Sequence, residues 1–228
     1  MNKSSEIRLD ILGLFLAGLL NTFFAMLDSG VVFAPGTKAF EPDLLDRAMW
    51  ISENTLRWQV GWLFWFAVTL SFAWSYFALG RHLEGDRNWV NLAVGLAIIA
   101  AAVDLVGIVI NLVVIPDLAT ALTHSTLGEA GSLQLFYQSM ENLATALINA
   151  TAYGLYSVAG LFLLPAMFST PSYPVWLKWL GACEWILAII ATALLLVAPA
   201  IATIPLVITF ILFAPWVWGS AYWIYNSV

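Results

Sequence analysis

The chain has 228 residues, of which 62% are hydrophobic and 10% are charged, with a net charge of −6. Soluble domains carry about a quarter charged residues, so this chain cannot cover a water-facing surface, and its natural solvent is a lipid bilayer. The negative balance excludes the basic patch that nucleic-acid binding needs, and the single cysteine excludes a disulfide within one chain.

Six apolar stretches are each long enough to cross a bilayer, which takes about 20 helical residues. We expect an all-α, polytopic integral membrane bundle that forms a single domain over residues 1–228. The expected spans are approximately 11–33, 56–80, 89–115, 134–168, 174–198 and 202–225. The fourth span is long enough to tilt strongly or to project from the membrane. The cut between the last two spans rests on Pro199 and Pro205, since proline can also merely kink a membrane helix.

The loop between the first two spans carries the signature of a short helix. Glu41-Pro42-Asp43 places a proline and two acids where a helix would start. Leu44, Leu45, Ala48 and Met49 would then share one face. We therefore expect a short interfacial helix on the outer membrane surface.

The basic residues near the span ends set the expected orientation. Cytoplasmic loops carry an excess of Lys and Arg. With both termini inside, the cytoplasmic side would hold Lys3, Arg8, Arg81, Arg87 and Lys178, against Lys38, Arg47 and Arg57 outside. The sequence thus predicts both termini in the cytoplasm and a bacterial inner membrane as the location.

Four carboxylates interrupt the apolar segments, namely Asp28, Asp104, Glu141 and Glu184. Placing a charged side chain in hydrocarbon costs at least roughly 2.5 kcal/mol, so such residues usually face a protein interior or a wet cavity. Each acid could be protonated, be satisfied by amide, hydroxyl or indole donors, or bind a cation. Arg57 could also reach Asp28 or Glu141 as a counter-ion.

Polar residues in the fourth span follow helical spacing. Gln138, Asn142, Thr145, Asn149, Tyr153 and Tyr156 are 4, 3, 4, 4 and 3 residues apart. This spacing places them on one face of a helix, which we expect to point into the bundle. The face would either join helices by hydrogen bonds or form one wall of a polar cavity.

Two further patterns point to the same outer half of the bundle. Asp28 follows Asn21 by seven residues, and Asn111 follows Asp104 by seven, so each pair shares a helix face. The second span carries a mostly aromatic row, made of Trp58, Trp62, Trp65, Thr69, Phe72 and Tyr76. This row would either pack against helices and lipid or form an aromatic wall for a cation.

No catalytic or metal-binding motif accompanies these patterns. His82 and His124 both fall in turns or loops, so a haem between two spans is not expected. No zinc-protease, nucleophile-elbow, phosphate-loop or Cys-x-x-Cys pattern is present. The sequence therefore names no cofactor and no metal site, and nothing specific supports an enzyme.

Several short motifs are similar to those of uncharacterised six-helix bacterial membrane proteins. They are Leu56-Arg57-Trp58, Gly80-Arg81-His82, Asp104 with Asn111, and the stretch from Pro174 to Gly181. The resemblance extends over most of the chain. It implies a six-helix topology and carries no assigned function.

The sequence favours an outward-facing acidic and aromatic cavity that binds or transports a proton, a cation or a small amphiphilic cation. The expected ligand-binding residues are Asp104, Glu184, Asn111, Asn142, Asn149, Tyr153, Asp28, Glu141, Trp62 and Trp65. The alternative is an accessory subunit that packs against pigments, lipids, a second copy or the helices of a larger membrane complex.

Overall fold

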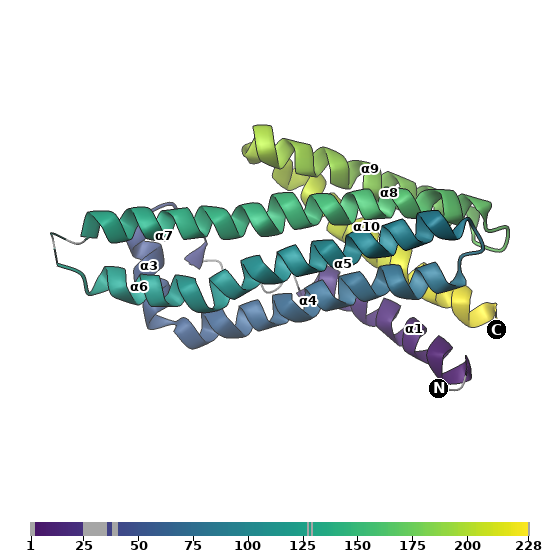
Figure 1. The fold of residues 1–228 in the computed structure, drawn as a ribbon, viewed down its shortest axis with the longest axis horizontal. Helices are drawn as coiled ribbons and strands as arrows, with labels where there is room; N and C mark the ends of the chain where they lie inside the picture. Colours follow the sequence, from purple (N-terminus) through teal and green to yellow (C-terminus); the bar gives the residue numbers. More distant parts are fainter. Residues whose placement is uncertain (1–2, 25–35, 38–40, 127, 129, 228) are drawn as a thin grey trace.

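The computed structural model describes residues 3–24, 36–37, 41–126, 128 and 130–227, and these residues form an elongated helical bundle (Figure 1). The helices, with π-helical segments written η, are α1 (Lys3–Gly18), η1 (Leu19–Phe24), α3 (Leu44–Glu53), α4 (Thr55–His82), α5 (Arg87–Val109), η4 (Ile110–Val114), α6 (Ile115–Thr123), α7 (Ala130–Thr145), η5 (Ala146–Ala152), α8 (Tyr153–Ser169), α9 (Val175–Val197) and α10 (Pro199–Asn226). The expected all-α membrane bundle is confirmed.

Five helical stretches within the described residues are long and apolar enough to cross a membrane. They are Thr55–His82, Arg87–Thr123, Ala130–Ser169, Val175–Val197 and Ile204–Asn226. The other expected span, 11–33, begins in α1 and η1, and its residues 25–33 lie outside the described part of the chain. The expected break at Pro199 is confirmed, whereas Pro205 lies inside α10.

Aromatic side chains fill the core at the end of the bundle where both termini lie, called here the terminal end (Figure 1). The rings of Phe72 and Phe213 stack with centroids 4.5 Å apart, and Trp185 meets Trp216 edge-on at 5.4 Å. A Cβ atom on Gly160 would lie 2.0 Å from the Trp185 ring, so only glycine admits that indole between α8 and α9. Burial of such rings dominates the energetics of a core.

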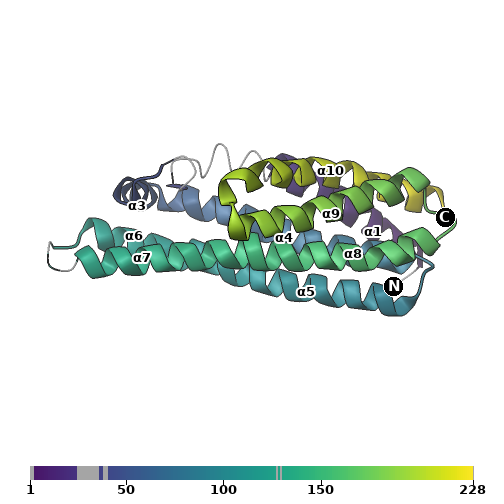
Figure 2. The ribbon, with the colours of Figure 1, turned by 90° about the horizontal axis from the view of Figure 1, so that it is seen from above.

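The other end of the bundle extends past α9 and α10. Gly154 of α8 lies against Thr192, and Gly160 lies against Trp185, so the antiparallel register places the end of α9 level with residue 149. Residues 130–148 then project beyond α9 by roughly 28 Å at the rise of an α-helix. Figures 1 and 2 show α3, α6 and α7 together in this distal extension. The fourth span thus extends beyond the neighbouring helix α9, and its expected tilt or projection from the membrane stays a prediction.

The distal extension has a hydrophobic core of its own, separate from the aromatic core. It consists of Ala48, Ile51, Trp58, Ile115, Ala119, Leu122 and Tyr137. Helices α3, α4, α6 and α7 contribute these residues. The bundle therefore contains two cores, and the boundary between them lies near the outer end of α9.

Helix α3 forms where the sequence predicts it, but it presents a different face to the protein. Asp43 caps the helix by accepting hydrogen bonds from the backbone N–H groups of Leu45 and Asp46. Arg47, Ala48 and Ile51 are buried, and α3 packs mainly against α6. Leu45 and Met49 stay about half exposed. Contact with α6 thus buries a face centred on Arg47, Ala48 and Ile51, and the expected placement of α3 on the membrane surface stays a prediction.

A buried ion pair joins α3 to α7. The Nη2 atom of Arg47 lies 2.8 Å from Oε2 of Glu141, and Nε donates to Oε1 at 3.0 Å. The Nη1 atom of the same arginine donates to the backbone oxygens of Glu41 and Pro42. Of the two partners considered for Arg57, Glu141 pairs with Arg47 instead and Asp28 lies outside the described residues. The Arg57 guanidinium lies over the Trp50 ring at 5.5 Å.

Replacing Glu141 with glutamine should loosen the distal extension. The Arg47 side chain is only 2% exposed, and removing one partner of a buried ion pair typically costs roughly 3–5 kcal/mol. We expect a lower unfolding midpoint in detergent and faster amide hydrogen exchange in α3. Glu53→Gln, which changes an exposed acid at the end of α3, is the matched control. Equal exchange rates in the two variants would contradict a structural role for the pair.

Candidate functional site

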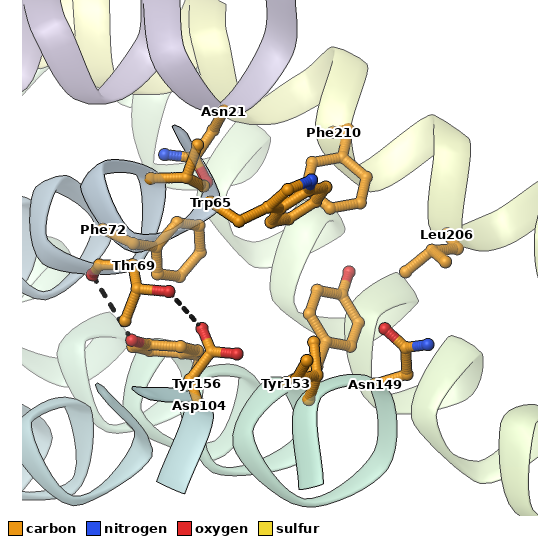
Figure 3. Close-up of a pocket in the computed structure, with 12 residues that line it drawn as sticks. Asn21, Trp65, Thr69, Phe72, Asp104, Asn149, Tyr153, Tyr156, Leu206 and Phe210 are labelled. Atoms are coloured by element: carbon orange, nitrogen blue, oxygen red, sulfur yellow. Dashed lines mark hydrogen bonds between the residues drawn. The ribbon is translucent and has the colours of Figure 1, made fainter. Parts of the chain in front are cut away.

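A cavity of about 210 Å³ lies where the aromatic core meets the distal extension (Figure 3). Helices α4, α5, α8 and α10 and the segments η1 and η5 surround it. Its lining consists of Asn21, Trp65, Val68, Thr69, Phe72, Asp104, Ile148, Asn149, Tyr153, Tyr156, Leu206 and Phe210. Asp104 is the only ionisable carboxyl group in this lining.

One oxygen of the Asp104 carboxyl group accepts a hydrogen bond, and the other has no donor within the described residues. The hydroxyl of Thr69 donates to Oδ2 at 2.6 Å. Oδ1 is buried and has no hydrogen-bond partner within the described residues. Figure 3 shows this second oxygen directed toward the side of the cavity on which Tyr153 lies. A buried acceptor without a donor costs about 1–3 kcal/mol, and at Asp104 this acceptor lies in the lining of the cavity.

Aromatic rings form most of the remaining wall. Trp65 and Phe72 come from α4, Tyr153 and Tyr156 from α8, and Phe210 from α10. The Tyr153 and Phe210 rings lie roughly parallel, with centroids 6.3 Å apart. The two tyrosine hydroxyls are already engaged, because that of Tyr153 bonds to the Thr209 hydroxyl and that of Tyr156 points to the Thr69 carbonyl. The cavity therefore presents ring faces beside one carboxyl group.

The three π-helical segments found within the described residues each contain an asparagine. Asn21 lies in η1, Asn111 in η4 and Asn149 in η5. Asn21 and Asn149 line the cavity, and η4 packs against α4 and α7 beside it. Single π-turns are rare and occur frequently at functional sites. Their gathering around one cavity marks this level of the bundle as specialised.

Two of these asparagines give backbone carbonyl groups a side-chain donor next to the π-turns. In a π-turn the backbone N–H bonds five residues back instead of four, so the carbonyl four residues back loses its usual donor. The side-chain Nδ2 of Asn21 donates to Ala17 O at 2.9 Å, and that of Asn111 donates to Gly107 O at 3.0 Å. The Trp58 indole donates in turn to Asn111 O at 2.6 Å. Side chains thus replace the backbone donors that lipid cannot supply.

The structure brings four of the ten expected site residues to the cavity. They are Asp104, Asn149, Tyr153 and Trp65. Asn111, Trp62, Asn142, Glu141 and Glu184 lie elsewhere in the fold, and Asp28 lies outside the described residues. Asn111 bonds to its own helix, Glu141 pairs with Arg47, and Trp62 packs against the distal core.

Glu184 is sealed in the aromatic core instead of lining the cavity. Its side chain is 2% exposed, and Oε2 has no hydrogen-bond partner within the described residues. The carboxyl group interacts electrostatically with the phenols of Tyr76, Tyr153 and Tyr173. Among these, Tyr153 also lines the cavity. Glu184 and Asp104 therefore occupy different surroundings and are not two ligands of one site.

The polar row of the fourth span does not face one direction: two of its members are at least half-buried and four are exposed. Tyr156 is buried and Tyr153 half-buried, whereas the remaining members of the row are exposed, namely Gln138, Asn142, Thr145 and Asn149. The prediction assumed an unbroken α-helix, but η5 interrupts it. Because a π-turn holds more residues than an α-turn, η5 rotates the α7 face relative to the α8 face. The prediction that the whole row points into the bundle is wrong.

The sequence patterns did not predict two lining residues, Phe210 and Leu206, or a cluster of charged side chains around Asp10 at the terminal end. Phe210 and Leu206 are apolar residues in an apolar helix, so no sequence signal separated them from lipid-facing neighbours. Asp10, which is 1% exposed, accepts from or donates to His82 at 3.1 Å and lies 3.7 Å from Arg81. The available signal was an acid just before the first expected span and a basic pair just after the second.

The cavity combines one carboxyl group with aromatic ring faces. Within the described part of the chain, no group of three or more His, Cys, Asp or Glu side chains could hold a metal ion. Comparisons with protein-family models, curated proteins and solved structures found no match. The chain is an integral membrane helical bundle with a buried aromatic cluster.

Replacing Asn111 with leucine should destabilise the bundle at η4. The Gly107 carbonyl would keep the Ile110 N–H as a donor but would lose the side-chain amide of Asn111, and one hydrogen bond typically contributes about 0.5–1.5 kcal/mol. We expect a lower unfolding midpoint in detergent, measured by circular dichroism. Asn91→Leu, at an exposed position on the same helix, is the control. Equal midpoints for the two variants would show that the side-chain hydrogen bond does not support the π-turn.

Proposed function

We propose that this membrane protein binds a small amphiphilic cation in the cavity beside Asp104. The observation that supports the proposal is the buried, unsatisfied Oδ1 atom of Asp104 at the edge of an aromatic-lined space. A cation placed there satisfies the carboxylate and contacts ring faces at the same time. Cation–π contacts contribute about 2 kcal/mol or more where water is excluded.

The size and lining of the cavity narrow the class of ligand. Pockets for drug-sized molecules span roughly 300–1,000 Å³, so a cavity of about 210 Å³ suits a smaller molecule. A quaternary ammonium group with one short apolar substituent matches this volume. A hydrated metal ion is a poorer match, because ring carbons cannot replace its oxygen ligands.

Binding is better supported than transport. Below the cavity, toward the terminal end, the side chains of Phe72, Phe213, Trp185 and Trp216 pack against each other. A ligand moving that way would have to separate rings that lie in mutual contact. Asn149 is exposed at the cavity edge, so the open approach is from the distal side. We infer a receptor-like or sequestering role for the site.

A proton alone and an accessory role account for less of the structure. A proton on Asp104 requires no aromatic cavity around the carboxyl group. An accessory subunit would use exposed apolar faces, such as Ile98, Ile99 and Val106 on α5, but lipid contact already requires such faces in a membrane helix. The cavity, by contrast, has no role in either alternative.

Purified protein in lipid nanodiscs should bind benzyltrimethylammonium saturably. We expect Asp104→Asn to weaken the dissociation constant about tenfold or more, since 1.4 kcal/mol corresponds to a factor of ten. The amide keeps an acceptor for Thr69, so the fold should persist. Equilibrium dialysis with the radiolabelled cation measures the constant directly.

Control measurements distinguish cation binding at Asp104 from non-specific attraction of the cation to other acidic residues. Asp117→Asn removes an exposed carboxylate from α6 and should leave the affinity unchanged. Benzyl alcohol, which lacks the charge, should compete weakly. The absence of saturable binding to the unmodified protein, or equal affinities for Asp104→Asn and the unmodified protein, would overturn the proposal.

A further inference from the structure

An apolar groove of about 640 Å³ runs between α1 and α10 at the terminal end, away from the cavity. Ile11, Leu12 and Phe15 of α1 line one wall, and Trp218 and Ala221 of α10 line the other. Arg8 lines the same groove nearer to the chain terminus. The groove therefore combines an apolar channel with one cationic residue.

Close packing of α1 against α10 builds the floor of the groove. The Phe15 and Trp218 rings stack with centroids 5.8 Å apart, and the indole N–H of Trp218 donates to Phe15 O at 3.0 Å. A Cβ atom on Gly18 would lie 2.4 Å from Nε1 of Trp218, so glycine is needed for this approach. Because the indole nitrogen is satisfied, the exposed part of the floor is apolar.

Arg8 is the charged residue at the terminal end of the groove. Its side chain is exposed, and no ion pair to it occurs within the described residues. The two nearest acids along α1, Glu6 and Asp10, each lie two residues from Arg8 and therefore on the other side of the helix. Asp10 pairs with Arg81 and His82. The acids of α1 thus leave the charge of Arg8 uncompensated.

We propose that this groove binds an anionic phospholipid, with its phosphate at Arg8 and an acyl chain along Leu12 and Phe15. Seven residues separate Arg8 from Phe15, which is roughly 10 Å along the helix axis. In a phospholipid, the phosphate and the upper part of an acyl chain lie a similar distance apart. The half-exposed Leu12 and Phe15 side chains offer apolar contact, and Tyr222 and Tyr225 place phenol groups at the interface, where tyrosine is enriched.

Charge selects the headgroup in this arrangement. Each basic residue near an anionic lipid surface contributes about 1 kcal/mol, which corresponds to about a fivefold preference. The apolar walls contact any acyl chain and do not distinguish one headgroup from another. Arg8 therefore determines the preference for anionic lipid, whereas the groove determines total lipid retention.

Native mass spectrometry of the full chain from mixed micelles tests the site. With equal amounts of phosphatidylglycerol and phosphatidylcholine carrying the same acyl chains, we expect about a fivefold preference for phosphatidylglycerol. Arg8→Gln should reduce this ratio to about one, while Leu12→Trp, which fills the groove, should reduce retention of both lipids. Arg57→Gln, an arginine at the distal side, should keep the preference.

Three results would overturn the proposal. An unchanged lipid ratio in Arg8→Gln would exclude Arg8 as the contact for the headgroup. Full lipid retention in Leu12→Trp would exclude the groove as the site of the acyl chain. Displacement of phosphatidylglycerol by millimolar glycerol 3-phosphate would indicate a simple anion site without a role for the acyl chain. None of these results bears on cation binding at Asp104, so the two proposals stand or fall separately.

Discussion

The fold depends on one constraint, namely that each backbone carbonyl inside the bilayer must find a donor within the protein. The π-segments break the regular helical ladder and release carbonyl groups at the level of the cavity. Side chains supply donors near these turns: Asn21 and Asn111 each donate to the carbonyl four residues earlier. Trp58 crosses from α4 to donate to η4. A helix bundle of this composition tolerates π-turns only where such donors are present.

The cavity lies at the junction of the two cores, where the pitch of two lining helices changes. Segments η1 and η5 contribute Asn21, Ile148 and Asn149 to its lining. A π-turn holds more residues than an α-turn, so the helix that follows it presents a rotated face. Asp104 and Thr69 line the same space from the regular helices α5 and α4. The cavity is therefore bounded both by regular helices and by segments whose pitch differs.

The spacing of residues predicted which side chains share a face where the helix is a regular α-helix. It gave the wrong faces where a π-helical segment interrupts the helix. The row on the second span shares one helix face as its spacing predicts: Trp58, Thr69, Phe72 and Tyr76 are buried, and Trp62 and Trp65 are half-buried. The cap of α3 is local chemistry and was predictable from Asp43. The outward direction of Asn142 was not predictable, because no residue pattern in the sequence indicates the π-helical segment η5. The partner of Glu141 was equally hidden, since Arg47 and Arg57 lie in the same region of the chain and only the packing of α3 decides between them.

Asp104 and Glu184 began as equivalent acids, and their surroundings give them different roles. Both lack an ion-pair partner within the described residues. Glu184 is enclosed by packed rings, where the cost of desolvating a charge favours a neutral carboxyl group. Asp104 has a hydroxyl donor on one oxygen and open space beside the other. Only the second arrangement leaves room for a ligand, so access, and not burial, separates a binding carboxylate from a packed one.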